Sequence, residues 1–201
     1  EKVPPMSFTE YEMTRNNIVP VECLNSAIKE ALYFSKNANE AYDSLFVQKT
    51  KVSQYWSRIN RADIKTYLSY GSLPFSFDMP NESAIYDSIS LLLDKIIKSD
   101  LPTLGSFDSN TLNAVKRLLF AIAENDVTSL AKLEEKFGGS PNRHTITSVF
   151  EALEKAEVLI KIPTYGSNMT IAKKANKYLF MSPAIRMSFF YFTGIENTYN
   201  V

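Results

Sequence analysis

The sequence of 201 residues has little cysteine, little histidine and no long apolar run. Its single cysteine, Cys23, excludes a disulfide bond within the chain, and its single histidine, His144, has no ligand partner at metal-binding spacing. No apolar stretch approaches the roughly 20 residues of a membrane span, and residues 1–5 lack the apolar segment of a signal peptide. We therefore expect a protein without membrane contact, located in a reducing cytoplasm.

The chain also lacks an excess of charge of either sign, with 22 basic and 22 acidic side chains. Residues 1–110 hold 11 Lys and Arg against 14 Asp and Glu, whereas the remaining residues hold 11 against 8. Binding to nucleic acid usually uses a concentrated basic surface that neutralises several phosphates. The mildly basic second part therefore allows nucleic-acid binding without requiring it.

Motifs for catalysis are absent as well. The sequence contains no G-x-x-x-x-G-K-[ST] loop to cradle phosphates, and no hydrophobic strand that ends in paired acids for magnesium. The acidic pairs Glu134 with Glu135 and Asp94 with Asp100 have no nucleophile or glycine-rich loop beside them, so charged helix faces explain them better. We expect no catalytic residue, metal site or bound cofactor in this chain, and catalysis is the interpretation we favour least.

What the sequence does contain is enough apolar residues, 45% of the total, for one or two buried cores. Helical spacing is clearest in residues 24–32 and in the long stripe over residues 85–97. Residues that favour helix N-caps precede several helical stretches: Ser7, Asn60 and Asn81. Because Pro102 disfavours helical geometry in Leu101, the long helix is expected to stop there, with a domain boundary at residues 105–108.

Residues 108–180 follow the order of a winged helix, in which three helices precede a β-hairpin. The first helix is expected to begin near Asp108, and the second to end at Gly138 and Gly139, which tolerate left-handed backbone. Ser140 would cap the third helix and Pro141 would occupy its first position. The third helix has one apolar stripe at i, i+3, i+4 and i+7, formed by Ile146, Val149, Phe150 and Leu153.

Two segments after that helix have strand character. Residues 158–163 alternate with a period of two, and residues 178–180 return as a second strand after a turn that contains Gly166. Ser182 and Pro183 then start a final helix. The sequence thus predicts a mainly α protein with a helical, lid-like region over residues 1–106, a winged-helix domain over 107–183 and a C-terminal helix over 184–201.

Five segments resemble, in the same order, prokaryotic AAA+-type ATPases in which a P-loop core is followed by a helical region and a winged helix. They are PPMSFTEY at residues 4–11, YLSYGSLP at 67–74, IIKSDLP at 96–102, LEKAEVLIKIP at 153–163 and NKYLFMSPAIR at 176–186. The resemblance implies an ATPase core before Glu1 and, in many relatives, a nuclease-like domain after about Asn200. This chain would then be a fragment whose partner is its own ATPase core, and ATP and magnesium would bind elsewhere in the full-length protein.

A winged helix that binds DNA inserts its third helix in the major groove. The candidate DNA-binding residues on this helix and the hairpin are Arg143, His144, Thr147, Lys161, Lys173 and Lys174. Arg143 and the wing lysines would contact phosphates, while His144 and Thr147 would approach base edges. Three acidic residues on the same helix and its end would repel a duplex: Glu151, Glu154 and Glu157. We favour a solvated helix surface over a DNA-binding surface for this reason.

Three functions therefore stay open, because a winged helix alone does not define an activity. The first is a non-catalytic accessory region that couples the nucleotide state of an ATPase to a partner, and it is the one we prefer. The second is a module that binds double-stranded DNA. The third is a structural or oligomerisation module, for which the aromatic run at residues 189–192 would provide the contact.

Overall fold

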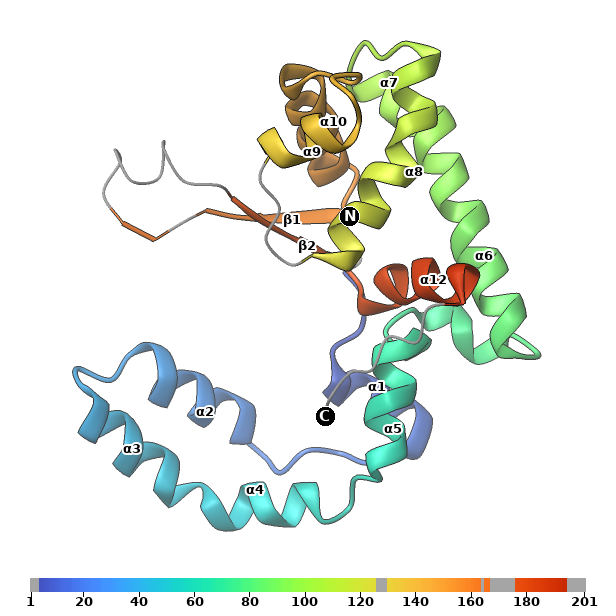
Figure 1. Ribbon diagram of the computed structural model, residues 1–201. Coiled ribbons are helices and arrows are strands. Elements are labelled where there is room, and N and C mark those ends of the chain that lie inside the picture. Colours follow the sequence, from blue (N-terminus) through green and yellow to red (C-terminus); the bar gives the residue numbers. More distant parts are fainter. Residues whose placement is uncertain (1–3, 126–129, 164, 167–175, 195–201) are drawn as a thin grey trace. The chain divides into compact units, whose positions relative to one another are not determined.

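The computed structural model describes residues 4–125, 130–163, 165–166 and 176–194. In these residues the chain is mainly helical and contains one antiparallel sheet of two strands (Figure 1). It divides into two compact units, of which the first comprises Met6–Phe77 and the second comprises Asp78–Val201 together with Glu1–Pro5. In the described part of the chain, every helix is too short or too polar to cross a membrane.

The first unit is entirely helical in the residues that the structure describes. Its α-helices are α1 (Phe8–Asn16), α2 (Leu24–Tyr33), α3 (Ala38–Val47), α4 (Lys49–Trp56) and α5 (Arg61–Thr66). A π-helical turn at Tyr67–Gly71 and a 3-10 helix at Pro74–Asp78 follow. The expected capping of α1 is confirmed, because Ser7 and Glu10 form a reciprocal capping box.

Aromatic side chains form the core of the first unit. Tyr11 is 1% exposed, and its ring lies 6.2 Å from Phe8, 5.6 Å from Tyr67 and 5.8 Å from Phe77, measured between ring centroids. The Tyr67 hydroxyl donates a hydrogen bond of 2.9 Å to the Met6 carbonyl. The packing also explains Gly71, where a Cβ atom would lie 2.5 Å from Cε2 of Tyr11. The end of this π-helical turn and α1 can meet only because Gly71 has no side chain.

The second unit contains most of the chain and its only described strands. Its helices are α6 (Glu82–Lys95), α7 (Leu101–Leu104), α8 (Ser109–Glu124), α9 (Leu130–Lys136), α10 (Arg143–Lys155) and α12 (Pro183–Thr193). The strands β1 (Leu159–Ile162) and β2 (Lys177–Phe180) pair antiparallel. N-caps predicted from the sequence are confirmed at Asn81, whose side chain accepts from Ala84 N–H, and at Ser182, whose side chain accepts from Ala184 N–H.

The predicted helix stop at Leu101 is wrong. A π-helical turn at Ile96–Asp100 leads directly into α7, and Leu101 has helical angles of φ −58° and ψ −42° although Pro102 follows it. The Leu101 N–H bonds to the Ile96 carbonyl, five residues back, so the wider turn accommodates the proline. Leu101 is also 0% exposed, and its burial outweighs the local preference before proline.

The structural division of the chain differs from the boundary expected at residue 106. Helices α6 and α7 belong to the second unit, where α6 packs on α12 and α7 packs on α10. Ile89 and Leu93 of α6 are buried, and the π-helical turn that continues α6 packs on α8, which buries eight residues. Residues 78–106 therefore fold with the segment that follows them, and the division lies between Phe77 and Asp78.

The β-ribbon packs on α10. In its register Leu159 pairs with Phe180 and Lys161 pairs with Tyr178, which places these four side chains on one face. Tyr178 is 5% exposed and contacts the ring of Phe150 in α10, with 4.7 Å between centroids. The two isoleucines of β1 point away from this face, with exposures of 38% and 39%.

Candidate interaction surface

Helix α10 provides the candidate functional surface, and its start differs from the prediction. Asn142, and not Ser140, is the N-cap, because the Asn142 side-chain oxygen accepts a 2.9 Å hydrogen bond from Thr145 N–H. Pro141 consequently precedes the helix instead of occupying its first position. The two glycines at the end of the preceding turn do have positive φ angles, 65° for Gly138 and 81° for Gly139, as predicted.

The inner face of α10 agrees with the predicted apolar stripe. Its four members are each at most 1% exposed: Ile146, Val149, Phe150 and Leu153. Because side chains at this spacing occupy one side of a helix, the polar residues between them are left on the outer side. The structure therefore presents the outer side of α10 as a surface, and the candidate residues of this helix lie on it.

Three candidate residues come together near the start of this surface. Arg143 and His144 are exposed, and Thr147 is partly exposed one turn further along. The Thr147 hydroxyl donates a 2.9 Å hydrogen bond to the Arg143 carbonyl, which occupies the only proton that this side chain can donate. Thr147 can therefore offer a ligand its hydroxyl oxygen as an acceptor, but not its hydroxyl proton.

The second half of the same surface is acidic. Glu151 and Glu154 are exposed, one and two turns beyond the basic first turn. A further carboxylate lies close to the start of the helix, because Glu134 of α9 accepts a 3.1 Å hydrogen bond from the Arg143 backbone N–H. Sequence reasoning did not assign this contact, since it depends on how α9 and α10 pack. The surface thus carries both charges, with Arg143 beside a carboxylate.

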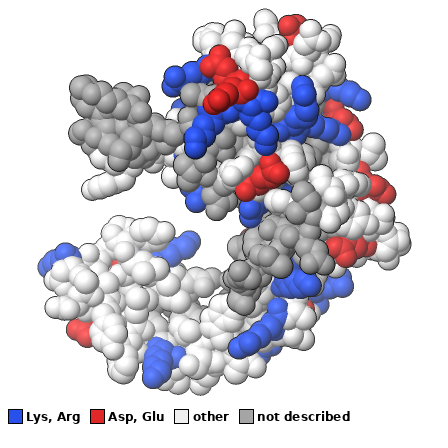
Figure 2. Space-filling model, viewed as in Figure 1, with Lys and Arg blue, Asp and Glu red and all other residues white. Residues whose placement is uncertain are grey.

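Of the three candidate lysines in the hairpin, the structure describes one. Lys161 lies in β1 and is partly exposed, beside Tyr178 in the register of the ribbon. Since β1 packs against α10, Lys161 belongs to the same region of the second unit. Lys173 and Lys174 lie outside the described residues. Figure 2 shows Lys and Arg side chains beside Asp and Glu side chains on the visible face of the second unit.

The phenol of Tyr178 has a pKa that is shifted by its surroundings in the ribbon and α10. Burial raises the pKa of its phenol above the ordinary value, a hydrogen bond with Asn176 opposes the shift, and the nearby carboxylates Glu154 and Glu151 add to it. The folded state therefore favours the neutral phenol. This contribution to stability is complete below about pH 10, the ordinary pKa of tyrosine, and is lost as the pH rises through the raised value.

We therefore expect the Tyr178→Phe variant to lose less thermal stability than the wild type between pH 9 and pH 11, because phenylalanine has no proton to lose. Melting temperatures followed by circular dichroism across this range would measure the difference. Tyr165→Phe is the matched control, since Tyr165 is 100% exposed. Equal alkaline losses for Tyr178→Phe and the wild type would show that the phenol is not buried against α10.

One member of each acidic pair noted in the sequence has a structural partner. Asp94 accepts a 3.0 Å hydrogen bond from Lys116 Nζ, and Glu134 contacts the backbone of α10 as described above. Among the residues that the structure describes, no three His, Cys, Asp or Glu side chains come close enough together to hold a metal ion. The described surface of α10 carries opposite charges on one helix.

Comparisons with known proteins place the chain in a family without defining an activity. The family model described as "Domain of unknown function (DUF8612)" matches residues 61–198. The match begins at α5 and leaves out α1–α4. The chain is also 30% identical over 196 residues to the uncharacterized protein MJ1637 of Methanocaldococcus jannaschii, covering 95% of this chain but only 38% of that protein. No solved structure matches.

Proposed function

The chain belongs to the DUF8612 family, and from the surface of α10 we propose that it is a non-catalytic accessory region of a larger prokaryotic, AAA+-type ATPase. In this proposal residues 107–183 form a winged helix that binds a protein partner. The helical first part packs on the ATPase core and follows its conformation. The nucleotide state of the core then changes the affinity for the partner by favouring one arrangement of these parts.

The order and packing of elements in the second unit support a winged helix. Three helices, α8, α9 and α10, precede the antiparallel ribbon, and both α9 and β1 pack on α10. The ribbon contributes Tyr178 to the buried side of α10 and leaves the opposite side of the helix in solvent. This is the arrangement in which a winged helix uses its third helix for binding.

The mixed charge of α10 is the observation that favours a protein partner. A duplex presents phosphates of one sign along its whole length, so Glu151 and Glu154 would oppose binding that Arg143 favours. A protein surface can match both signs, and such complementarity fixes the orientation of a complex and excludes wrong partners.

The length of MJ1637 supports the proposal that this chain is one part of a larger protein. This chain spans 38% of the length of MJ1637, so more than half of that relative lies outside the matched region. A P-loop core would fit in such a region, as the resemblance of five segments to AAA+-type ATPases implies. In the proposal the core binds ATP and magnesium, and the full-length protein is cytoplasmic and works as an enzyme although this chain does not.

We expect Arg143→Glu in the full-length protein to weaken partner binding about tenfold, because it places a third carboxylate on a surface already acidic at its other end. Stimulation of ATP hydrolysis by the partner should fall with it, while basal hydrolysis stays unchanged. The control is Lys95→Glu, an equal charge change at an exposed position of α6. Unchanged binding and unchanged stimulation would remove α10 from the mechanism.

DNA binding is the second candidate, favoured by the exposed Arg143 and His144 at the start of α10. Under the preferred account, fluorescence anisotropy should detect no binding of the chain to a labelled duplex of about 20 base pairs, even at about 50 mM salt. An affinity that falls steeply with salt, and that weakens when Lys173 and Lys174 are replaced by glutamate, would establish DNA binding instead.

A further inference from the structure

The first unit has a surface that its own residues leave uncovered. Helices α2 and α3 pack against each other and are joined by residues 34–37, yet α3 contains no buried residue. Large apolar side chains on and beside the two helices are exposed, with 79% for Phe34 at the end of α2 and 75% for Val47 in α3. A pair of helices that buries so little of its apolar surface usually has a further element packed on it.

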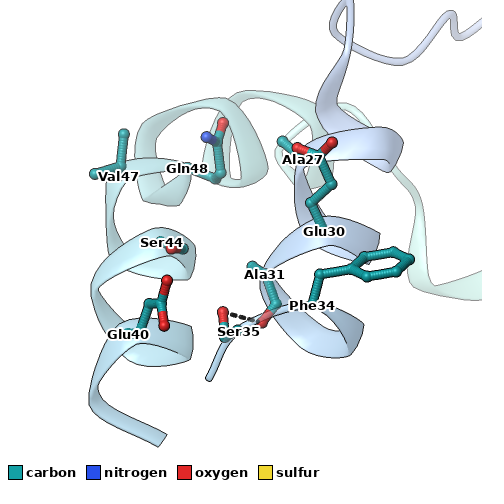
Figure 3. Close-up of a pocket in the computed structure, with 9 residues that line it drawn as sticks. All are labelled: Ala27, Glu30, Ala31, Phe34, Ser35, Glu40, Ser44, Val47 and Gln48. Carbon is teal, nitrogen blue, oxygen red and sulfur yellow. Dashed lines mark hydrogen bonds between the residues drawn. The ribbon is translucent and has the colours of Figure 1, made fainter. Parts of the chain in front are cut away.

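The uncovered surface is a groove between α2 and α3 of about 680 Å³ (Figure 3). Small side chains line much of it, and three of them follow one another at intervals of four residues on and just after α2: Ala27, Ala31 and Ser35. Ser44 lines the α3 side, and Phe34 and Val47 add apolar surface to the groove. Small residues along a helix allow the backbone of another helix to approach closely.

The charged and polar groups of the groove are mainly hydrogen-bond acceptors. Glu30 and Glu40 are its only charged lining residues. The Ser35 hydroxyl donates a 2.8 Å hydrogen bond to the Ala31 carbonyl, which leaves its oxygen as an acceptor. Oε1 of Gln48 is buried and has no hydrogen-bond partner. A buried acceptor without a donor is costly, so an occupant of this groove would gain by supplying donors.

We propose that the α2–α3 groove binds one amphipathic helix of a partner protein, with alanine or leucine on its inner face and lysine or arginine beside Glu30 and Glu40. Such a helix would complete a three-helix arrangement, cover Phe34 and Val47, and donate hydrogen bonds to the acceptors. A second copy of the chain fits less well, because like grooves face to face would bring the glutamates of both copies together. The inference stands independently of the proposed function, since it concerns only α2 and α3.

Two labelled peptides of about 20 residues would test this inference on the 201-residue chain by fluorescence anisotropy. Both carry the same face of alanine and leucine, and one has lysine where the other has glutamate. The lysine peptide should bind at least tenfold more tightly than the glutamate peptide. Glu30→Lys should weaken the lysine peptide about fivefold and strengthen the glutamate peptide, as expected for a pair of exposed charges. Glu40 is kept, because its carboxylate accepts a 2.8 Å hydrogen bond from Lys36 N–H.

Two further variants complete the experiment. Ser44→Trp should fill the groove and prevent binding of both peptides, while Glu22→Lys, an equal charge change at an exposed residue outside the groove, should bind like the wild type. Circular dichroism would verify that each variant is folded. Equal affinity for the two peptides, no binding of either, or an equal effect of Glu22→Lys would overturn the proposal. A dimer that Ser44→Trp converts to a monomer would also overturn it, by placing a second copy in the groove.

Discussion

Phe150→Ala is expected to lower the free energy of unfolding of the second unit by about 3–5 kcal/mol, the usual cost of removing a buried aromatic side chain. The Phe150 side chain is 1% exposed and lies between α10 and the ribbon, with its ring 4.7 Å from that of Tyr178. The substitution removes apolar contacts and leaves a cavity at the point where the ribbon joins the helix. The outer surface of α10 should lose its fixed position as a consequence.

Urea unfolding followed by far-ultraviolet circular dichroism would measure the change in the second unit. Phe192→Ala is the matched control, because Phe192 lies on α12 of the same unit and is 52% exposed. Its cost should stay within roughly 1 kcal/mol, as for most exposed positions. If Phe150→Ala lowered the free energy of unfolding by as little as Phe192→Ala does, the packing of the ribbon on α10 would be contradicted.

Tyr11→Ala should have a comparable effect in the first unit, about 3–5 kcal/mol by the same cavity argument. Tyr11 is the centre of an aromatic cluster and occupies the space that the absent side chain of Gly71 leaves. Phe8 and Tyr67 would lose a ring on one side, and water cannot replace those contacts.

The single tryptophan offers a local readout for this variant. Trp56 belongs to the first unit, and its ring stacks on Phe8 with 6.0 Å between centroids. Its fluorescence during urea unfolding should report a lower midpoint for Tyr11→Ala than for the wild type. Tyr33→Ala, at a position that is 77% exposed in the same unit, should leave the midpoint nearly unchanged. Matching midpoints for all three proteins would show that the cluster contributes little to stability.

Local signals in the sequence predicted the starts of several helices. Ser7, Asn60, Asn81 and Ser182 each accept a backbone hydrogen bond as N-caps, because capping depends only on residues within one turn. Two predictions of helix ends that were based on proline residues were wrong. Leu101 stays helical before Pro102 because its side chain is buried, and α10 starts after Asn142 although Ser140 and Pro141 offered a cap.

The candidate surface was predictable only along one helix. Helical spacing alone brings Arg143, His144 and Thr147 to the same region of α10, and the structure agrees. The contact between Glu134 and the start of α10, and the face of β1 that becomes buried, depend on how separate elements pack. The groove between α2 and α3 was not predictable for the same reason, because its lining comes from two helices.

The central proposal is that this chain acts through its surfaces and has no catalytic site of its own. Hydrolysis of ATP in the presence of magnesium, measured side by side for the 201-residue chain and for the full-length protein, tests it most directly. The account predicts release of phosphate by the full-length protein and none above the buffer level by the chain. Hydrolysis by the 201-residue chain itself would contradict the account.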